Sequence, residues 1–87
     1  MAVSLLSLIV PAYKQEKTIA KDLKNLDMSL SSLPVKYEII VVVDGYVDKT
    51  YQKIKTLRME NLKILGYKKN RGKGFAIKLG VDKAKGD

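Results

Sequence analysis

Apolar residues occur in two kinds of pattern that take turns along this chain. One is a short apolar run, and the other is a longer stretch in which apolar residues have helical spacing. The runs Ser4–Val10 and Tyr37–Val43, and the more loosely alternating segment Leu62–Tyr67, predict three β-strands. In the segment Lys17–Leu33 apolar positions recur every three or four residues, which predicts a helix with one buried face. The residues expected on that face are Ile19, Leu23, Leu26, Leu30 and Leu33.

Two shorter helices are predicted in the rest of the chain. Lys49–Leu57 should form one, with Asp48 as its N-cap. Another should follow the turn Asn70–Gly74 and end at Gly86 as C-cap. The residues expected on its buried face are Ala76, Ile77, Gly80, Val81 and Ala84.

The order of these elements predicts the fold class. Strands that alternate with helices are joined by right-handed crossovers and form a parallel sheet. We therefore predict an α/β fold, a three-layer Rossmann-like half domain with strand order 3-2-1 and flanking helices. Residues 1–87 should form a single unit, because 87 residues are enough for one domain at most.

The composition excludes several kinds of site. The chain has no cysteine and no histidine, so disulfides, Cys/His metal sites and His-activated nucleophiles are excluded. The missing cysteines favour a cytoplasmic location. The apolar start, Ala2–Val10, lacks a positive n-region and is interpreted as a strand, not a signal peptide.

The net charge is +8, and basic residues concentrate toward the end of the chain. Such a face attracts nucleic acid or an anionic membrane surface, unless it is simply a solvated lysine-rich surface. Few aromatic residues lie among these lysines, which makes nucleic acid the less favoured partner. The basic residues are Lys63, Lys68, Lys69, Arg71, Lys73, Lys78, Lys83 and Lys85.

An aspartate stands at the end of the central apolar run. Tyr37–Val43 suits a strand covered on both faces, and it stops at Asp44 and Gly45. Ligands of parallel sheets bind at the carboxyl ends of the strands, and a glycine permits a sharp turn there. Asp44 is therefore a candidate acceptor for a base or a ribose. The alternative is a turn aspartate that bonds its own backbone.

The turn after the first strand carries further candidate contacts. Tyr13 offers a flat ring for stacking, and Gln15 or Glu16 offers a polar contact to a base or a ribose. An ordinary strand-to-helix connection has the same composition, so this motif alone does not decide between the two interpretations.

The turn Asn70–Gly74 combines glycines with Arg71 and Lys73 before a predicted helix, a composition that attracts anions. It lacks the Walker A spacing, and Ile77 stands where the dinucleotide fingerprint has its third glycine. The alternative is a loop whose glycines only permit tight packing.

Taken together and in this order, the three motifs resemble those of family 2 glycosyltransferases, inverting enzymes with the GT-A fold that use nucleotide-sugar donors. Pro11–Glu16 is similar to the family's Pro-Ala-Tyr-Asn-Glu-Glu element, and Val42–Thr50 to its Val-Asp-Asp-Gly-Ser-x-Asp-x-Thr element. Lys69–Ala76 is similar to Lys-Asn-x-Gly-Lys-Gly-x-Ala, most closely in the dolichyl-phosphate glucosyl- and mannosyltransferase branch.

The resemblance implies a nucleotide-sugar-binding fragment of an enzyme that transfers a hexose from a UDP- or GDP-sugar to a polyprenyl phosphate. The parent enzyme would lie in the cytoplasm, at the membrane face. The nucleotide-binding residues implied by position are Pro11, Ala12, Tyr13, Gln15, Asp44, Gly45, Arg71 and Lys73.

The sequence departs from the family's pattern inside two motifs. Lys14 and Gln15 stand where the family has asparagine and glutamate, Val43 replaces the first aspartate of a pair, and Tyr46 replaces a serine. An amide at position 15 still bonds a hydroxyl but carries no charge, so a lower nucleotide affinity is expected.

The family's metal-binding Asp-x-Asp motif and catalytic base correspond to positions beyond Asp87. We therefore expect no metal site and no catalytic residue in residues 1–87, and no activity of this chain alone; Mg²⁺ or Mn²⁺ is expected for the full-length family. The apolar run Ser4–Val10 would form a sheet edge, which invites pairing into a homo-oligomer. The alternatives are a small basic module that binds nucleic acid or an anionic membrane, and a self-associating structural remnant.

Overall fold

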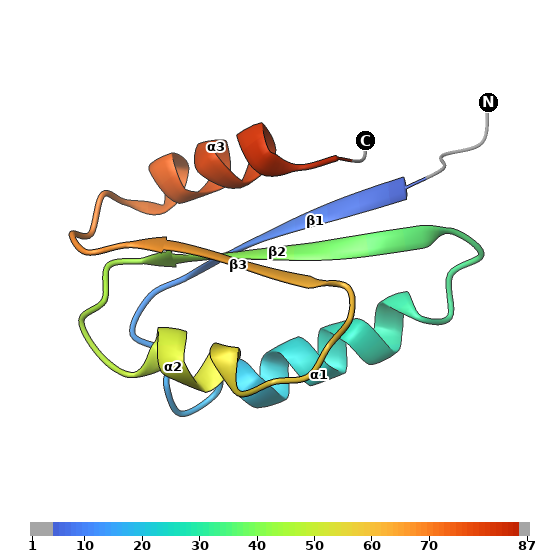
Figure 1. Cartoon of the computed structure of the whole chain (residues 1–87), viewed down its shortest axis with the longest axis horizontal. Coiled ribbons are helices and arrows are strands. Elements are labelled where there is room, and N and C mark those ends of the chain that lie inside the picture. The colour runs from blue at the N-terminus through green and yellow to red at the C-terminus, as the bar shows by residue number, and fades with distance from the viewer. Residues whose placement is uncertain (1–4, 86–87) are drawn as a thin grey trace.

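The computed structural model describes residues 5–85, which form a parallel sheet between two layers of helices (Figure 1). The strands are β1 (Leu5–Ala12), β2 (Lys36–Asp44) and β3 (Leu62–Tyr67). The helices are α1 (Ile19–Leu30), α2 (Thr50–Lys55) and α3 (Lys73–Lys83). The strand order is β1-β2-β3, with both pairs parallel, so the predicted α/β class and strand order are confirmed.

Strand β2 lies at the centre and is buried on both faces, as its continuous apolar run predicts. Ile39, Val41 and Val43 face α1 and α2, while Ile40 and Val42 face α3. Because successive side chains of a strand point to opposite faces, this one strand supplies both cores.

Helix α1 is shorter than predicted. It starts at Ile19 and ends at Leu30, and the hydroxyl groups of Ser31 and Ser32 bond back to carbonyl groups of its last turn. The serines thus satisfy backbone groups that would otherwise continue the helix. Leu33, expected on the buried face, lies beyond this end and is 41% exposed.

Strand β1 continues through Pro11 to Ala12, beyond the predicted end at Val10. Pro11 lies opposite Val42 in the parallel register. A proline is tolerated there because β1 is at the edge of the described sheet, where only one side needs ladder hydrogen bonds. The predicted positions Ser4 and Gly86 lie outside the described residues.

The predicted buried face of α3 was wrong in part. Ala76 and Gly80 are buried, but Ile77 and Val81 are exposed, and Leu79 packs on the sheet instead. A Cβ atom at Gly80 would lie 2.4 Å from Cγ2 of Ile9, so the helix backbone rests directly on the sheet there. This close approach selects the small residues for the contact and turns the branched ones outward.

Candidate functional site

A pocket of about 580 Å³ opens at the carboxyl ends of β1 and β2, beside the start of α3. Its volume is within the range of small-molecule sites. Its lining residues are Pro11, Ala12, Tyr13, Gln15, Asp44, Asn70, Gly72 and Lys73.

The parallel register explains why segments distant in sequence meet here. Ala12 pairs with Val43 at the end of β1, and Asp44 pairs with Tyr67 at the end of β3. The carboxyl ends of all the described strands therefore lie at the same end of the sheet, and the turns that follow them form the pocket walls.

Asp44 is 4% exposed and holds the turn after β3. From the described residues its carboxylate accepts four hydrogen bonds. The donors to Oδ1 are the Tyr67 hydroxyl at 2.6 Å and the Arg71 N–H at 2.7 Å. The donors to Oδ2 are the Asn70 side-chain amide at 2.8 Å and the Gly72 N–H at 3.0 Å. Since a carboxylate has about four acceptor positions, these bonds occupy its capacity.

The same contacts set the protonation of the Asp44–Tyr67 pair. Burial by itself raises the pKa of Asp44, but the bonds from the Arg71 N–H, the Tyr67 hydroxyl and the Gly72 N–H outweigh it and lower the pKa below its usual value. Burial and the bond to Asp44 raise the pKa of Tyr67 to about 12. Near neutral pH Asp44 is thus an anion and Tyr67 a neutral donor.

Gly45 allows the turn after β3 to pack closely against the end of β2. Its φ of +97° lies in the left-handed region, and a Cβ atom on it would lie 3.0 Å from the backbone nitrogen of Asn70. A side chain at this position would both strain the backbone and push the turn away from Asp44. Gly45 shapes the pocket without lining it.

The loop after β1 is held by the start of α2. The Gln15 N–H donates to the Thr50 hydroxyl at 2.8 Å, and Asp48 Oδ1 accepts from the Thr50 hydroxyl at 2.6 Å and the Thr50 N–H at 2.9 Å. Asp48 therefore serves the first turn of α2, although the N-cap position falls on Lys49, one residue later than predicted. Hydrogen bonds from Thr50 lower the pKa of Asp48.

The pocket mouth is flanked by an aromatic ring and cations. Tyr13 is 40% exposed, and the Lys14 ammonium lies 5.3 Å from the centre of its ring. Lys73 lines the pocket at the first position of α3. The Arg71 guanidinium instead lies 5.1 Å from the centre of the Phe75 ring, so Arg71 serves the site through its backbone N–H.

The structure brings most of the sequence-predicted site residues together. Pro11, Ala12, Tyr13, Gln15, Asp44 and Lys73 line the pocket, whereas Gly45 and Arg71 do not. Two lining residues were missed, Asn70 and Gly72. The sequence could have indicated both, because they belong to the glycine-rich turn Asn70–Gly74. Only the charged residues of that turn, Arg71 and Lys73, were predicted to bind the ligand.

Residues 5–85 contain no group of three or more acidic, His or Cys side chains placed to hold a metal ion. Among these residues the pocket lining offers one carboxylate, Asp44, whose acceptor positions are occupied, so they do not fit the Mg²⁺ or Mn²⁺ expected for the full-length family. Over the same residues, no helix has the length and apolar character needed to cross a bilayer.

Comparison with known proteins agrees with the arrangement of the motifs. The family model described as "Glycosyl transferase family 2" matches residues 7–87. The dolichyl-phosphate beta-glucosyltransferase of Dictyostelium discoideum is 37% identical over 86 residues, which cover 87% of this chain and 26% of that protein. The human dolichyl-phosphate beta-glucosyltransferase is 32% identical over 94 residues, covering 94% of this chain and 28% of that protein.

An uncharacterised glycosyltransferase of Synechocystis is 34% identical over 84 residues, covering 94% of this chain and 26% of that protein. The chain thus spans about a quarter of the length of these relatives. Because the family model covers nearly the whole chain and the three motifs meet at one pocket, the chain belongs to glycosyltransferase family 2.

Proposed function

We propose that the pocket binds the nucleotide part of a UDP- or GDP-sugar. The observation that carries this proposal is the convergence of three separate turns on one cavity of nucleotide size, lined by Tyr13, Gln15 and Lys73. In this proposal the base lies against Tyr13 and Pro11, and Gln15 bonds a ribose hydroxyl.

The charge around the pocket supports a diphosphate. The N-cap of α3 is Gly72, and its first turn contains no acidic residue. A helix start carries partial positive charge, and Lys73 adds a full charge at the same place. The anionic Asp44 already accepts the N–H groups of Arg71 and Gly72 there, so the lysine is the main attraction for a phosphate group. The Lys14 ammonium lies over the ring of Tyr13, which lines the pocket. These features favour a ligand with phosphate groups over a neutral one.

Asp44 contributes to this site indirectly, by binding the turn after β3. A direct bond from its carboxylate to a base would require one of its present donors to move away, since its acceptor positions are occupied. We therefore propose that Asp44 shapes the wall formed by Asn70 and Gly72, and that Gln15 and Lys73 make the polar contacts.

The parent reaction that we propose is transfer of a hexose to a polyprenyl phosphate. The bond between the sugar C1 and the donor diphosphate breaks, a bond from C1 to an acceptor phosphate oxygen forms with inversion, and the nucleoside diphosphate leaves. The relatives named as dolichyl-phosphate glucosyltransferases support this acceptor class, and a membrane-face location of the parent enzyme follows from it.

The 87-residue chain should not perform this reaction alone. Of the described residues that line the pocket, Asp44 is the one carboxylate, and a low pKa with occupied acceptor positions makes it a poor base. The assay would supply UDP-glucose or GDP-mannose, Mn²⁺ and a short polyprenyl phosphate. Release of UDP or GDP coupled to product would contradict this part of the proposal.

Calorimetric titration with UDP, GDP, uridine and guanosine tests the binding site. We expect one nucleoside diphosphate to bind more tightly than its nucleoside. Lys73→Ala should reduce the preference for the diphosphate, and Gln15→Ala should weaken both ligands. Lys24→Ala, an exposed change in α1 outside the pocket, is the control. No heat with any of the ligands would overturn the proposed function.

We also propose that the chain forms a homo-oligomer through the β1 edge. Among the described strands β1 pairs on one side alone, with β2. Ile77 and Val81, which are 36% and 57% exposed, lie on the flank of α3 opposite Phe75, which contacts β3. A second copy beside β1 would cover them. Sedimentation should detect a dimer that Val81→Lys weakens; a wild-type monomer at all concentrations would contradict this.

A further inference from the structure

Outside the pocket, the described chain holds a second buried carboxylate on β2. Glu38 is 6% exposed and lies on the face of the sheet that α3 covers, near the end opposite to Asp44. Nothing in the proposed ligand site uses it, since it does not line the pocket. Because burying a carboxylate costs free energy unless it is well paired, its partners indicate what it does.

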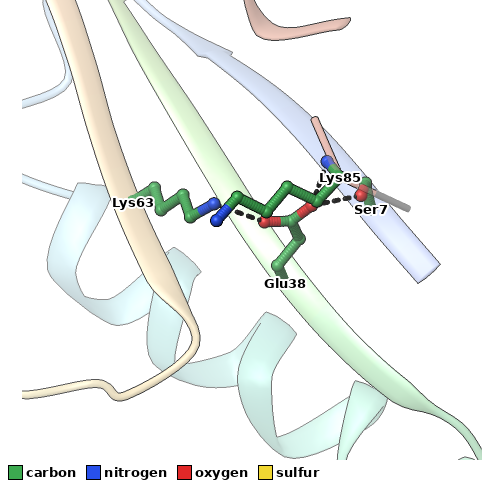
Figure 2. A network of polar contacts seen from close by, with 4 residues as sticks. All are labelled: Ser7, Glu38, Lys63 and Lys85. Carbon is green, nitrogen blue, oxygen red and sulfur yellow. Dashed lines mark hydrogen bonds and ion pairs between the residues drawn. The ribbon is translucent and has the colours of Figure 1, made fainter. Parts of the chain in front are cut away.

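The partners of Glu38 come from three other segments, as Figure 2 shows. The Ser7 hydroxyl of β1 and the Lys85 backbone N–H, which follows α3, donate to Oε2, the latter at 2.8 Å. The Lys63 ammonium of β3 lies 3.0 Å from Oε1. One carboxylate thus ties together both neighbouring strands and the chain that leaves α3.

Asp44 makes the corresponding contacts at the other end of the same helix. It accepts the N–H groups of Arg71 and Gly72, directly before α3, and Glu38 accepts the N–H of Lys85, shortly after it. A strand rises about 20 Å between Glu38 and Asp44. The 11 residues of α3 rise about 16 Å, and the extended residues that flank the helix add the remaining few ångströms between Gly72 and Lys85. The two carboxylates are therefore spaced to hold both ends of α3.

Between these ends, α3 contacts the sheet mainly through small residues. The fully buried residues of α3 are Ala76 and Gly80, which are small. Leu79 packs on the sheet in part, while Phe75, Ile77 and Val81 are exposed. The close approach of Gly80 to Ile9 sets how near the helix lies to the sheet, while the hydrogen bonds at its two ends are directional. The backbone bonds at the two ends therefore contribute to the position of α3 along β2.

We propose that Glu38 is a positioning residue for the pocket: it holds the far end of α3 and so sets where Gly72 and Lys73 lie at the near end. The inference rests on the proposed function only for the choice of nucleotide probes, because the position of α3 can be measured without a ligand.

A pair of variants at Lys85 isolates the decisive hydrogen bond. Lys85→Pro removes the backbone N–H that Glu38 accepts, and the preceding residue, Ala84, has the extended ψ of 142° that a proline tolerates. Lys85→Ala keeps the N–H and removes only the side chain, so it is the matched control. Glu38→Ala removes the carboxylate itself.

The first measurement is amide hydrogen exchange of the chain without ligand. We expect Lys85→Pro and Glu38→Ala to speed exchange at Arg71, Gly72 and Lys73, at the far end of the helix, while Lys85→Ala does not. Faster exchange confined to the end of α3 near Lys85 would show a purely local bond and would overturn the proposal.

The second measurement is the Kd for UDP and GDP, made well below the melting temperature. We expect Lys85→Pro and Glu38→Ala to raise the Kd about three- to tenfold. Ile54→Val, a cavity change in α2 on the opposite face, controls for loss of stability and should leave the Kd unchanged. A purely structural Glu38 would lower the melting temperature with no change in Kd.

The two proposals fail in different ways. If the wild-type chain binds neither nucleotide, the proposed function fails, and the exchange measurement still decides the role of Glu38. If nucleotide binds and both the exchange at Gly72 and the Kd are unaffected by Lys85→Pro, the positioning role alone is wrong.

Discussion

At the scale of single residues, the polar side chains of this protein act mainly on backbone groups. Asp44 accepts N–H groups of the turn after β3, and the Thr50 hydroxyl accepts the N–H of the turn after β1. Buried polar atoms in these turns are satisfied by other groups of the protein, which fixes the turns without a ligand. The pocket is therefore built before anything binds to it.

Replacing Asp44 tests this arrangement directly. Asp44→Asn keeps the shape but brings an amide donor against the N–H donors of the turn, so we expect a loss of about 2–4 kcal/mol of unfolding free energy. Tyr67→Phe removes one donor and should cost about 1 kcal/mol. Urea unfolding measures both, and equal costs for the two variants would contradict the central role of Asp44.

At the scale of secondary-structure elements, the central strand β2 organises the molecule. Its alternate residues supply both apolar cores, and its two buried carboxylates hold the ends of α3. The hydrogen bond from Ser7, the bond from the Lys85 N–H and the pairing with Lys63 outweigh burial and lower the pKa of Glu38 to about 2. The contact between α3 and the sheet therefore depends on pH.

The sign of this dependence follows from the lowered pKa. Since Glu38 ionises more readily in the folded chain, it stabilises the fold fully above its usual pKa of 4.5, and this contribution is lost as the pH falls toward 2. The difference in unfolding free energy between the wild type and Glu38→Gln should shrink over that interval. Urea unfolding at stepped pH measures it, and a constant difference from neutral pH to pH 2 would contradict the prediction.

At the scale of the whole molecule, the net charge of +8 bears on ligand binding. Raising NaCl from about 0.1 M to about 1 M shortens the Debye length from about 10 Å to about 3 Å. We expect the Kd of the nucleoside diphosphate to rise about threefold or more over this range, because exposed charges are screened. The uncharged nucleoside is the control, and parallel changes for both ligands would argue against a role for the lysines.

The sequence by itself determined the order of elements, the parallel sheet and most of the pocket lining. Continuous apolar runs and helical spacing are local, so they are readable without a fold. They end the first two strands at Val10 and Val43, close to the observed ends at Ala12 and Asp44. The parallel topology then places the turn residues Tyr13, Gln15 and Lys73 at one edge.

Only the tertiary structure decided which residues meet across the sheet. The close approach at Gly80 turned Ile77 and Val81 outward, against their apolar character. The donors to Asp44 and Glu38 lie far from them in sequence. A local pattern therefore predicts neither that the acceptor positions of Asp44 are occupied nor that Glu38 contacts the end of α3. The role of a buried carboxylate depends on the groups that it bonds, and only the complete fold brings those groups together.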